Sequence, residues 1–142
     1  MIEDKQTFIR NFFDNVWNTR NVGRVGNYVG PRYTIHHDPG DPWEGQTLDL
    51  EGWKNRLVTS CAPFPDQIFT ITEMVSDGDR VVVFWTWKGT HKGDLPGFPA
   101  GGKVIKTSGV TIYYFAGDKL SGHWQIVDRL GIFQQLSQQQ NL

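Results

Sequence analysis

The residues of this chain best suited to acid–base chemistry are one aspartate and two histidines. Asp128 follows an aromatic stretch, His37 ends a short β-rich run, and His91 precedes a loop rich in glycine and proline. A carboxyl group in apolar surroundings has a raised pKa and can transfer protons near neutral pH. A neutral histidine can orient such a carboxyl group or hydrogen-bond a substrate carbonyl. These three side chains are the candidates for catalysis by proton transfer.

The alternation of side chains in the last predicted strand decides where Asp128 points. Residues two apart in a strand share a face, so Asp128 shares the face of Trp124 and Ile126. We expect this bulky face to point inward, which places Asp128 at the end of an apolar strip. Aspartate is also a favoured N-cap residue, and a helix is predicted directly after Asp128. Spacing alone leaves both roles open, and they are not exclusive.

A structural role is also open for each histidine. His91 borders the Gly/Pro-rich loop 92–103, which must be anchored to the sheet, and backbone hydrogen bonds from this residue would do so. For His37 the anchoring and the catalytic roles are evenly balanced. His36 points to the opposite side of its strand from His37, away from the expected pocket.

Helical patterns come first along the chain and β patterns follow. The helical patterns cover residues 5–17, capped by Asp4, then a short segment from residue 21, and residues 49–61. The β patterns cover residues 32–37, 67–75, 80–91, 104–115 and 120–128, with a last helical segment at 130–136. Helices before strands predict an α+β fold, with the mainly antiparallel sheet curved around the helices, in one domain over residues 1–142.

Aromatic residues are abundant, at 13% of the chain, and suit the wall of an apolar pocket. Each of them taken singly is more often a core residue. As a group they predict a pocket for a flat, hydrophobic small molecule. The expected lining residues are Tyr33, Phe12, Trp17, Trp85, Trp87, Trp124 and Ile126.

The overall composition argues against several classes of protein. The formal net charge is −1 with no basic stripe, so we expect no nucleic-acid partner. No apolar run approaches the ~20 residues of a membrane span, no signal peptide is apparent, and Cys61 is a lone cysteine, which together predict a cytoplasmic protein without membrane contact. No metal-binding spacing, nucleophile elbow or phosphate-binding loop occurs, so neither a metal nor another cofactor is expected.

Two stretches of the second half resemble the SnoaL-like polyketide cyclases, a family of the NTF2-like superfamily. The pattern GTHxG…GxP…GK and the pattern GK…W-x-x-x-D…QL both occur in order. The matching residues are Gly89, Thr90, His91, Gly93, Gly97, Pro99, Gly102, Lys103, Gly117, Lys119, Trp124, Asp128, Gln135 and Leu136. Upstream, the residues from His36 to Pro39 and the pair Glu51–Gly52 are also similar to the family. The chain departs from it at Ala100–Gly101 and at His123, where an acidic residue is common.

The resemblance implies an α+β cone with a deep pocket. It also implies a cofactor-independent ring closure by intramolecular aldol condensation, with Asp128 as the acid and base that forms the enolate. Independently of the resemblance, His37 and His91 are the candidates to assist Asp128. The substrate would be a hydrophobic, enolisable small molecule.

Two alternatives stay open at this point. The same fold could serve an isomerase, a dehydratase or an epoxide hydrolase, although the last would need a larger polar network. It could also serve a non-enzymatic module that binds a small ligand or a protein. On every interpretation an open curved sheet leaves one face to cover, so we expect a homodimer or homotetramer.

Overall fold

The structure, a computed structural model, describes the backbone of residues 4–140 and the side chains of residues 4–138. It begins with helix α1 (Lys5–Phe12), which continues as a π-helical turn, η1 (Phe13–Trp17). The Asp4 side chain accepts a hydrogen bond from the Thr7 backbone N–H and so caps α1 as predicted. A 3₁₀-helix, η2 (Val22–Asn27), and helix α2 (Leu50–Cys61) complete the helical layer. None of the helices described is long and apolar enough to cross a membrane.

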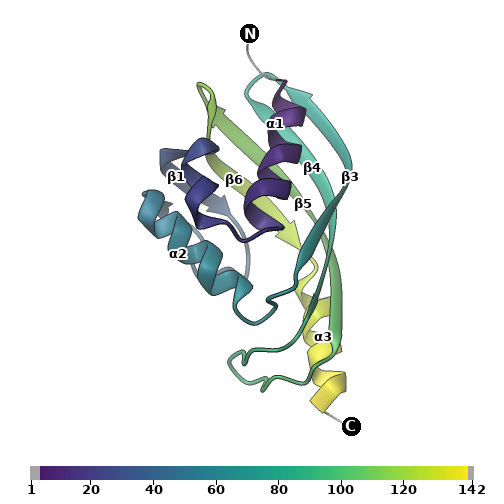
Figure 1. The fold of residues 1–142 in the computed structure, drawn as a ribbon. Helices are drawn as coiled ribbons and strands as arrows, with labels where there is room; N and C mark the ends of the chain where they lie inside the picture. The colour runs from purple at the N-terminus through teal and green to yellow at the C-terminus, as the bar shows by residue number, and fades with distance from the viewer. Residues whose placement is uncertain (1–3, 141–142) are drawn as a thin grey trace.

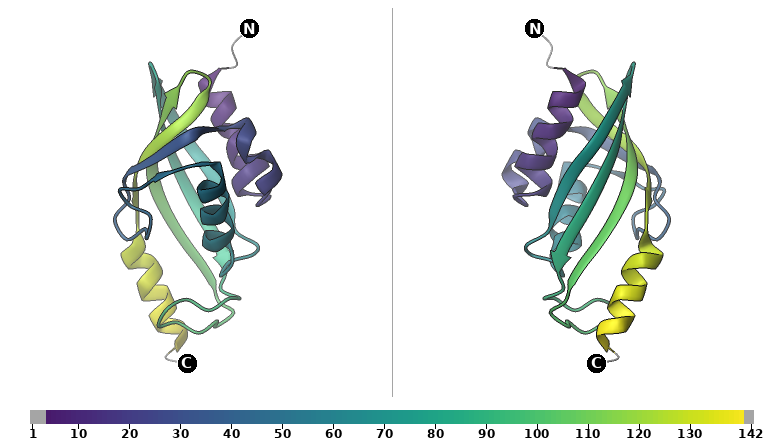
Figure 2. Two further views of the ribbon diagram at one scale, coloured as in Figure 1. Left: turned by 90° about the vertical axis from the view of Figure 1, so that its left-hand side faces the viewer. Right: turned by 90° about the vertical axis from the view of Figure 1, so that its right-hand side faces the viewer.

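A six-stranded curved sheet packs against these helices (Figures 1 and 2). Its strands are β1 (Val29–His37), β2 (Thr47–Leu48), β3 (Ile68–Asp77), β4 (Arg80–Thr90), β5 (Val104–Ala116) and β6 (Lys119–Val127). The order across the sheet is β2-β1-β6-β5-β4-β3, and neighbours are antiparallel except for the parallel pair β1 and β6. The predicted α+β architecture with a mainly antiparallel sheet is therefore confirmed.

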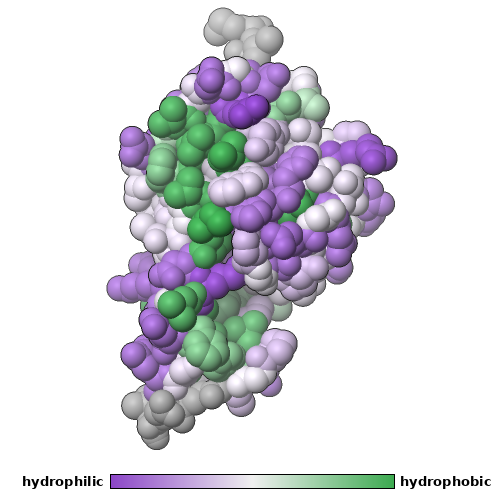
Figure 3. Space-filling view, turned by 180° about the vertical axis from the view of Figure 1, so that it is seen from behind, coloured by the Kyte–Doolittle hydropathy of each residue, from purple (hydrophilic) through white to green (hydrophobic). Residues whose placement is uncertain are grey.

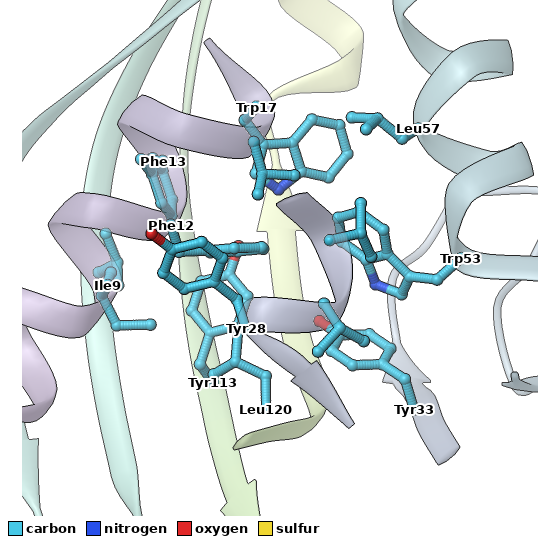
Figure 4. Close-up of a cluster of buried hydrophobic side chains, with 14 of the residues drawn as sticks. Ile9, Phe12, Phe13, Trp17, Tyr28, Tyr33, Trp53, Leu57, Tyr113 and Leu120 are labelled. Atoms are coloured by element: carbon cyan, nitrogen blue, oxygen red, sulfur yellow. The ribbon is translucent and has the colours of Figure 1, made fainter. Parts of the chain in front are cut away.

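The main core lies between the helices and the concave face of the sheet (Figure 4). Phe12 is its centre, because its ring meets those of Tyr28, Trp53 and Tyr113 at centroid distances of 5.7–5.8 Å. Such edge-on and tilted aromatic contacts stabilise a core by more than the burial of their apolar surface alone. Phe12 is fully buried in this core and does not line the pocket, so its predicted place in the pocket wall is wrong.

A second, smaller cluster holds the far end of the sheet together. Helix α3 (Arg129–Gln140) runs beside the loop between β4 and β5 at the lower end of Figure 1. Leu136 of α3 is buried with Phe64 and Ile105. The rings of Phe98 in the loop and Phe133 in α3 also meet, with centroids 5.5 Å apart. These contacts fix both the loop and α3 against the strands.

Strand β6 breaks the alternation that the sequence suggested. Its register with β5 shifts between Leu120, which faces Phe115, and Gly122, which faces Tyr114, so Ser121 is the extra residue of a bulge. A one-residue shift exchanges the two faces of a strand. Leu120 therefore points inward, and so does His123, whereas Trp124 is 37% exposed.

The convex side of the sheet carries hydrophobic side chains that the helices do not cover. Seen from behind, green side chains gather over the upper part of this face and again near its lower end (Figure 3). Trp124 and Ile126, at 37% and 45% exposure, belong to the exposed hydrophobic residues. Their predicted inward orientation is wrong, because the bulge at Ser121 turns them to this outer side.

Candidate active site

A pocket of about 180 Å³ lies between the helices and the concave face of the sheet. One part of its wall is aromatic and comprises Phe13, Trp17, Phe69, Trp85, Trp87 and Tyr113. Another part is polar and comprises Tyr33, His123, Gln125, Arg56, Asp41 and Arg129. A mostly apolar cleft with a few convergent polar groups is typical of a small-molecule site.

Asp38 joins the polar residues from behind the pocket wall. It follows β1 directly, is fully buried, and accepts hydrogen bonds from four side chains. The donors, with their distances, are His123 Nε2 (2.8 Å), Gln125 Nε2 (3.0 Å), Arg129 Nη2 (2.9 Å) and Arg56 Nη2 (3.5 Å). A buried carboxylate requires such partners, because an unpaired one is too costly to desolvate.

Tyr33, His123 and Asp38 form a continuous hydrogen-bonded series. The Tyr33 hydroxyl lies 2.7 Å from Nδ1 of His123, and the opposite ring nitrogen, Nε2, lies 2.8 Å from Asp38. A carboxylate only accepts hydrogen bonds, so Nε2 carries the ring hydrogen and Nδ1 accepts from the tyrosine hydroxyl. The series thus has the order of a hydroxyl, a neutral imidazole and a carboxylate, which is suited to moving a proton.

The surroundings favour these protonation states. Burial raises the pKa of Asp38, but the hydrogen bond from His123 and the charges of Arg56 and Arg129 outweigh it, so the net pKa is lowered. Burial lowers the pKa of His123 more than the hydrogen bond to Asp38 raises it. Burial also raises the pKa of Tyr33 well above its usual value. Near neutral pH the series therefore holds a phenol, a neutral imidazole and a carboxylate.

These pKa directions predict that the protein loses stability as the pH falls from 7 to 5. The unfolded chain binds a proton at His123 near pH 6.5, whereas the lowered folded-state pKa keeps the buried imidazole neutral, so acid favours unfolding. Asp38 acts in the same direction, but only below about pH 4. Urea unfolding at pH 7 and pH 5 would measure the loss. The variant His123→Gln should show a smaller loss over this interval, and an unchanged loss would contradict the assignment.

Arg56 places a positive charge in the same wall. It extends from α2, is 5% exposed, and pairs with Asp41 at 2.8 Å. Its guanidinium carbon also lies 5.9 Å from the centroid of the Trp17 ring. A fixed cation in a low-dielectric pocket stabilises negative charge that develops on a substrate oxygen.

The structure places Asp128 outside the pocket. Its side chain is exposed, and Oδ1 accepts a hydrogen bond of 2.9 Å from the Gly131 backbone N–H in the first turn of α3. The predicted position on the inner face of β6 is wrong because of the bulge at Ser121. The acid–base role of Asp128 stays a prediction, and its position supports the capping role.

Two substitutions at Asp128 separate these roles. Asparagine caps helices about as well as aspartate, so we expect Asp128→Asn to keep both stability and turnover, whereas Asp128→Ala should lose ~1 kcal/mol of unfolding free energy. Asp49→Ala is the matched control, because Asp49 caps α2 through Gly52 N–H at 2.7 Å. Substrate turnover and urea unfolding are measured on the unmodified protein and on each of the three variants. Loss of turnover in a stable Asp128→Asn protein would instead establish the carboxyl group as catalytic.

Neither of the other two predicted catalytic residues lines the pocket. The His37 ring stacks on the Trp124 ring, with centroids 4.5 Å apart and planes 13° apart. His91 is fully buried; its backbone N–H donates to Lys103 O and its carbonyl accepts from Gly102 N–H, both at 2.9 Å. These bonds close the loop between β4 and β5, which is the anchoring role considered for His91.

The pocket wall contains some of the predicted residues and several that the sequence did not suggest. The structure places Tyr33, Trp17, Trp85 and Trp87 along it. Asp38 and His123 were missed as site residues. The available signal was His123 itself, because a histidine stands where the resembling family commonly has an acidic residue. Among the residues described, no three side chains of His, Cys, Asp or Glu converge as a metal site.

Comparison with known proteins gives the family and the fold of the chain. The sequence profile of the SnoaL-like polyketide cyclases matches residues 7–136. A protein of Acidithiobacillus ferrooxidans, described as a candidate polyketide cyclase, is 52% identical, with a TM-score of 0.91 over 97% of this chain and 98% of its own. A search of curated proteins found no match.

More distant structures share the fold. IdmH of Streptomyces antibioticus, described as a candidate polyketide cyclase, is 24% identical and has a TM-score of 0.81 over 95% of this chain and 99% of its own. A SnoaL-like polyketide cyclase of Agrobacterium tumefaciens is 22% identical, with a TM-score of 0.75 over 95% and 99% of the two chains. The helical layer and curled six-stranded sheet are the NTF2-like α+β fold of these proteins. The chain belongs to the SnoaL-like polyketide cyclase family.

Proposed function

We propose that the chain is a cofactor-independent enzyme of the polyketide cyclase type, which removes a proton next to a carbonyl group and closes a ring by intramolecular aldol condensation. The observation that carries the proposal is the series Tyr33–His123–Asp38 in the wall of an aromatic pocket. Membership of the family supports the reaction class. The proposal transfers the acid–base role from Asp128 to His123.

The proton would travel along this series. The Tyr33 oxygen takes the proton from the substrate carbon while its own proton passes to Nδ1 of His123, 2.7 Å away. The C–H electron pair becomes an enolate, and the imidazolium that forms is stabilised by the Asp38 carboxylate at 2.8 Å. The enolate carbon then attacks a second carbonyl carbon of the same molecule. Return of the proton through Tyr33 to the new alkoxide restores the starting state.

The rest of the pocket would lower the barrier without transferring protons. The Arg56 cation stabilises the negative charge of the enolate, and its pairing with Asp41 holds it in place. Flat aromatic walls restrict a hydrophobic substrate to a few orientations. When the pocket holds the two reacting carbons in line, much of the entropy cost of ring closure is removed from the reaction step.

The experiment that tests the proposal measures enolisation directly. 2-Acetylnaphthalene is incubated with the protein in D₂O, and NMR follows the exchange of its acetyl methyl protons for deuterium. We expect the protein to accelerate exchange above the buffer rate, because forming the enolate is the first step. Failure to accelerate exchange would contradict the proposal for this substrate class.

One observation favours a second candidate, hydrolysis of an epoxide. Arg56 contacts both Asp38 (3.5 Å) and Asp41 (2.8 Å), so two carboxylates share one guanidinium group beside the pocket. Such a network could activate a water molecule between a base and a general acid. Incorporation of ¹⁸O from labelled water into the product of a naphthyl epoxide distinguishes this reaction from ring closure, which incorporates no oxygen from water.

A further inference from the structure

Gln67 has an orientation that one hydrogen bond fixes. Its side-chain oxygen, Oε1, lies 3.2 Å from Nε1 of Trp87. The indole N–H is only a donor, so the amide atom that faces it must be the oxygen. The amide nitrogen of Gln67 therefore points away from Trp87.

This amide nitrogen has two N–H bonds and no described acceptor. The Gln67 side chain lines the pocket and is 3% exposed, and its Nε2 has no hydrogen-bond partner among the residues described. Buried donors without partners are rare in folded proteins, and they are costly to maintain. An unpaired donor in a pocket wall is explained if a bound ligand accepts a hydrogen bond from it.

Gln67 stands at the other end of the pocket from the proton-transfer series. His123 is opposite Tyr113 of β5, whereas Trp87, the partner of Gln67, is opposite Thr107 of the same strand. These two positions on β5 are six residues apart, which corresponds to roughly 20 Å along a strand. Side chains that reach into the pocket from both ends shorten this gap. Between the ends lies Trp85, opposite Gly109 of β5, and the Phe69 ring packs against its ring with centroids 5.0 Å apart.

We propose that Gln67 is a specificity-determining residue, whose amide nitrogen donates a hydrogen bond to a carbonyl oxygen at the end of the substrate remote from the enolised carbon. The ligand class is then an elongated, flat and hydrophobic molecule with one oxygen at each end. Its enolisable ketone lies at Tyr33, and its second carbonyl oxygen lies at Gln67. The inference deepens the proposed function and rests on it for the orientation of the substrate, but not for the contact with Gln67.

A matched pair of ligands tests this contact. 2,6-Diacetylnaphthalene carries a carbonyl at both ends, and 2-acetyl-6-isopropylnaphthalene has the same shape with only one. We expect the protein to bind the diketone about tenfold more tightly, which corresponds to one hydrogen bond to a buried donor. In Gln67→Met the two ligands should bind equally, because the donor is gone while the affinity for the monoketone is kept. Calorimetric titration gives the four dissociation constants.

Two further variants make the result specific. Gln67→Glu keeps an oxygen for Trp87 and, as the ionised carboxylate, has no donor. At a pH high enough to ionise it, this variant should also lose the preference, even if the methionine variant folds poorly. Gln46→Met, the same change at an exposed position on a loop, should keep it. Retention of the tenfold preference in both Gln67 variants, or no preference in the unmodified protein, would overturn the inference.

The same ligands separate this inference from the proposed enzyme function. In Tyr33→Phe, exchange of the acetyl protons should slow by about 10²- to 10⁴-fold while the preference for the diketone remains. A preference that depends on Gln67 in a protein that never accelerates exchange would support the binding contact and contradict the cyclase proposal. Accelerated exchange with no effect of Gln67 on the preference would support the cyclase proposal and contradict the contact with Gln67.

Discussion

The variant His123→Gln is expected to slow the exchange of substrate protons by about 10²- to 10⁴-fold, the usual contribution of a general base. Glutamine has about the size of histidine and can still hydrogen-bond Asp38 or Tyr33. It cannot accept the tyrosine proton at neutral pH, because an amide is far less basic than an imidazole. The fold should therefore persist while proton transfer is lost. Tyr33→Phe should reduce the rate to a similar degree, because it removes the group that contacts the substrate.

The measurement is the NMR exchange rate at saturating 2-acetylnaphthalene, with circular dichroism to verify folding. His37→Gln and His36→Gln are the controls. His37 stacks on Trp124 outside the pocket, and His36 is exposed beside the ring of Tyr114. Both controls should keep the unmodified rate. An undiminished rate in His123→Gln, or a loss in His37→Gln that matches it, would contradict the assignment of the base.

Asp38→Asn is expected to lower the free energy of unfolding by about 3 kcal/mol, within the range for breaking a buried ion pair. Asp38 is fully buried and accepts from His123, Gln125 and two arginines. An asparagine presents an N–H group to at least one of these donors and removes the charge that balances the arginines. The contribution of Arg129 is small, because that side chain is 37% exposed, whereas Arg56 loses a partner in a buried setting.

Urea unfolding at pH 7, followed by tryptophan fluorescence, gives this free energy. Asp66→Asn is the matched control, since the exposed Asp66 carboxylate accepts bonds from Thr90 N–H and Oγ1–H at 2.7 and 2.6 Å. The control should lose less than ~1 kcal/mol, as expected for an exposed polar contact. Equal losses in the two variants would show that Asp38 is not the centre of the buried network.

The sequence was a good guide to the elements because their signals are local. Asp4 and Asn21 mark the starts of the first two helical segments, and each side chain accepts the expected backbone hydrogen bond. In β4 the side chains of Val81, Val83 and Trp85 point inward, as strict alternation predicts. These features depend on residues within a few positions of one another, so the sequence pattern contains them.

The site was harder to predict because it depends on one bulge and on distant contacts. Before the bulge at Ser121, Leu120 obeys the expected alternation, and after it every residue of β6 changes face. No local property of the sequence marks that extra residue. Asp38 and His123, 85 residues apart, meet only because β1 pairs in parallel with β6. A turn-like sequence around Asp38 indicates a loop, not a buried carboxylate.

The parallel pairing of β1 with β6 also determines when the site can form during synthesis and folding. β1 stands near the start of the chain, and its sheet neighbour β6 is the last strand to be made. Contacts between distant segments form slowly, because a long loop must close before any of them is gained. A nascent chain that ends before Lys119 has α1, η2, α2 and the β3–β4–β5 meander but exposes the edges of β1 and β5, which favours aggregation. Ligands that bind the completed pocket should therefore increase the yield of folded protein by acting on this final step.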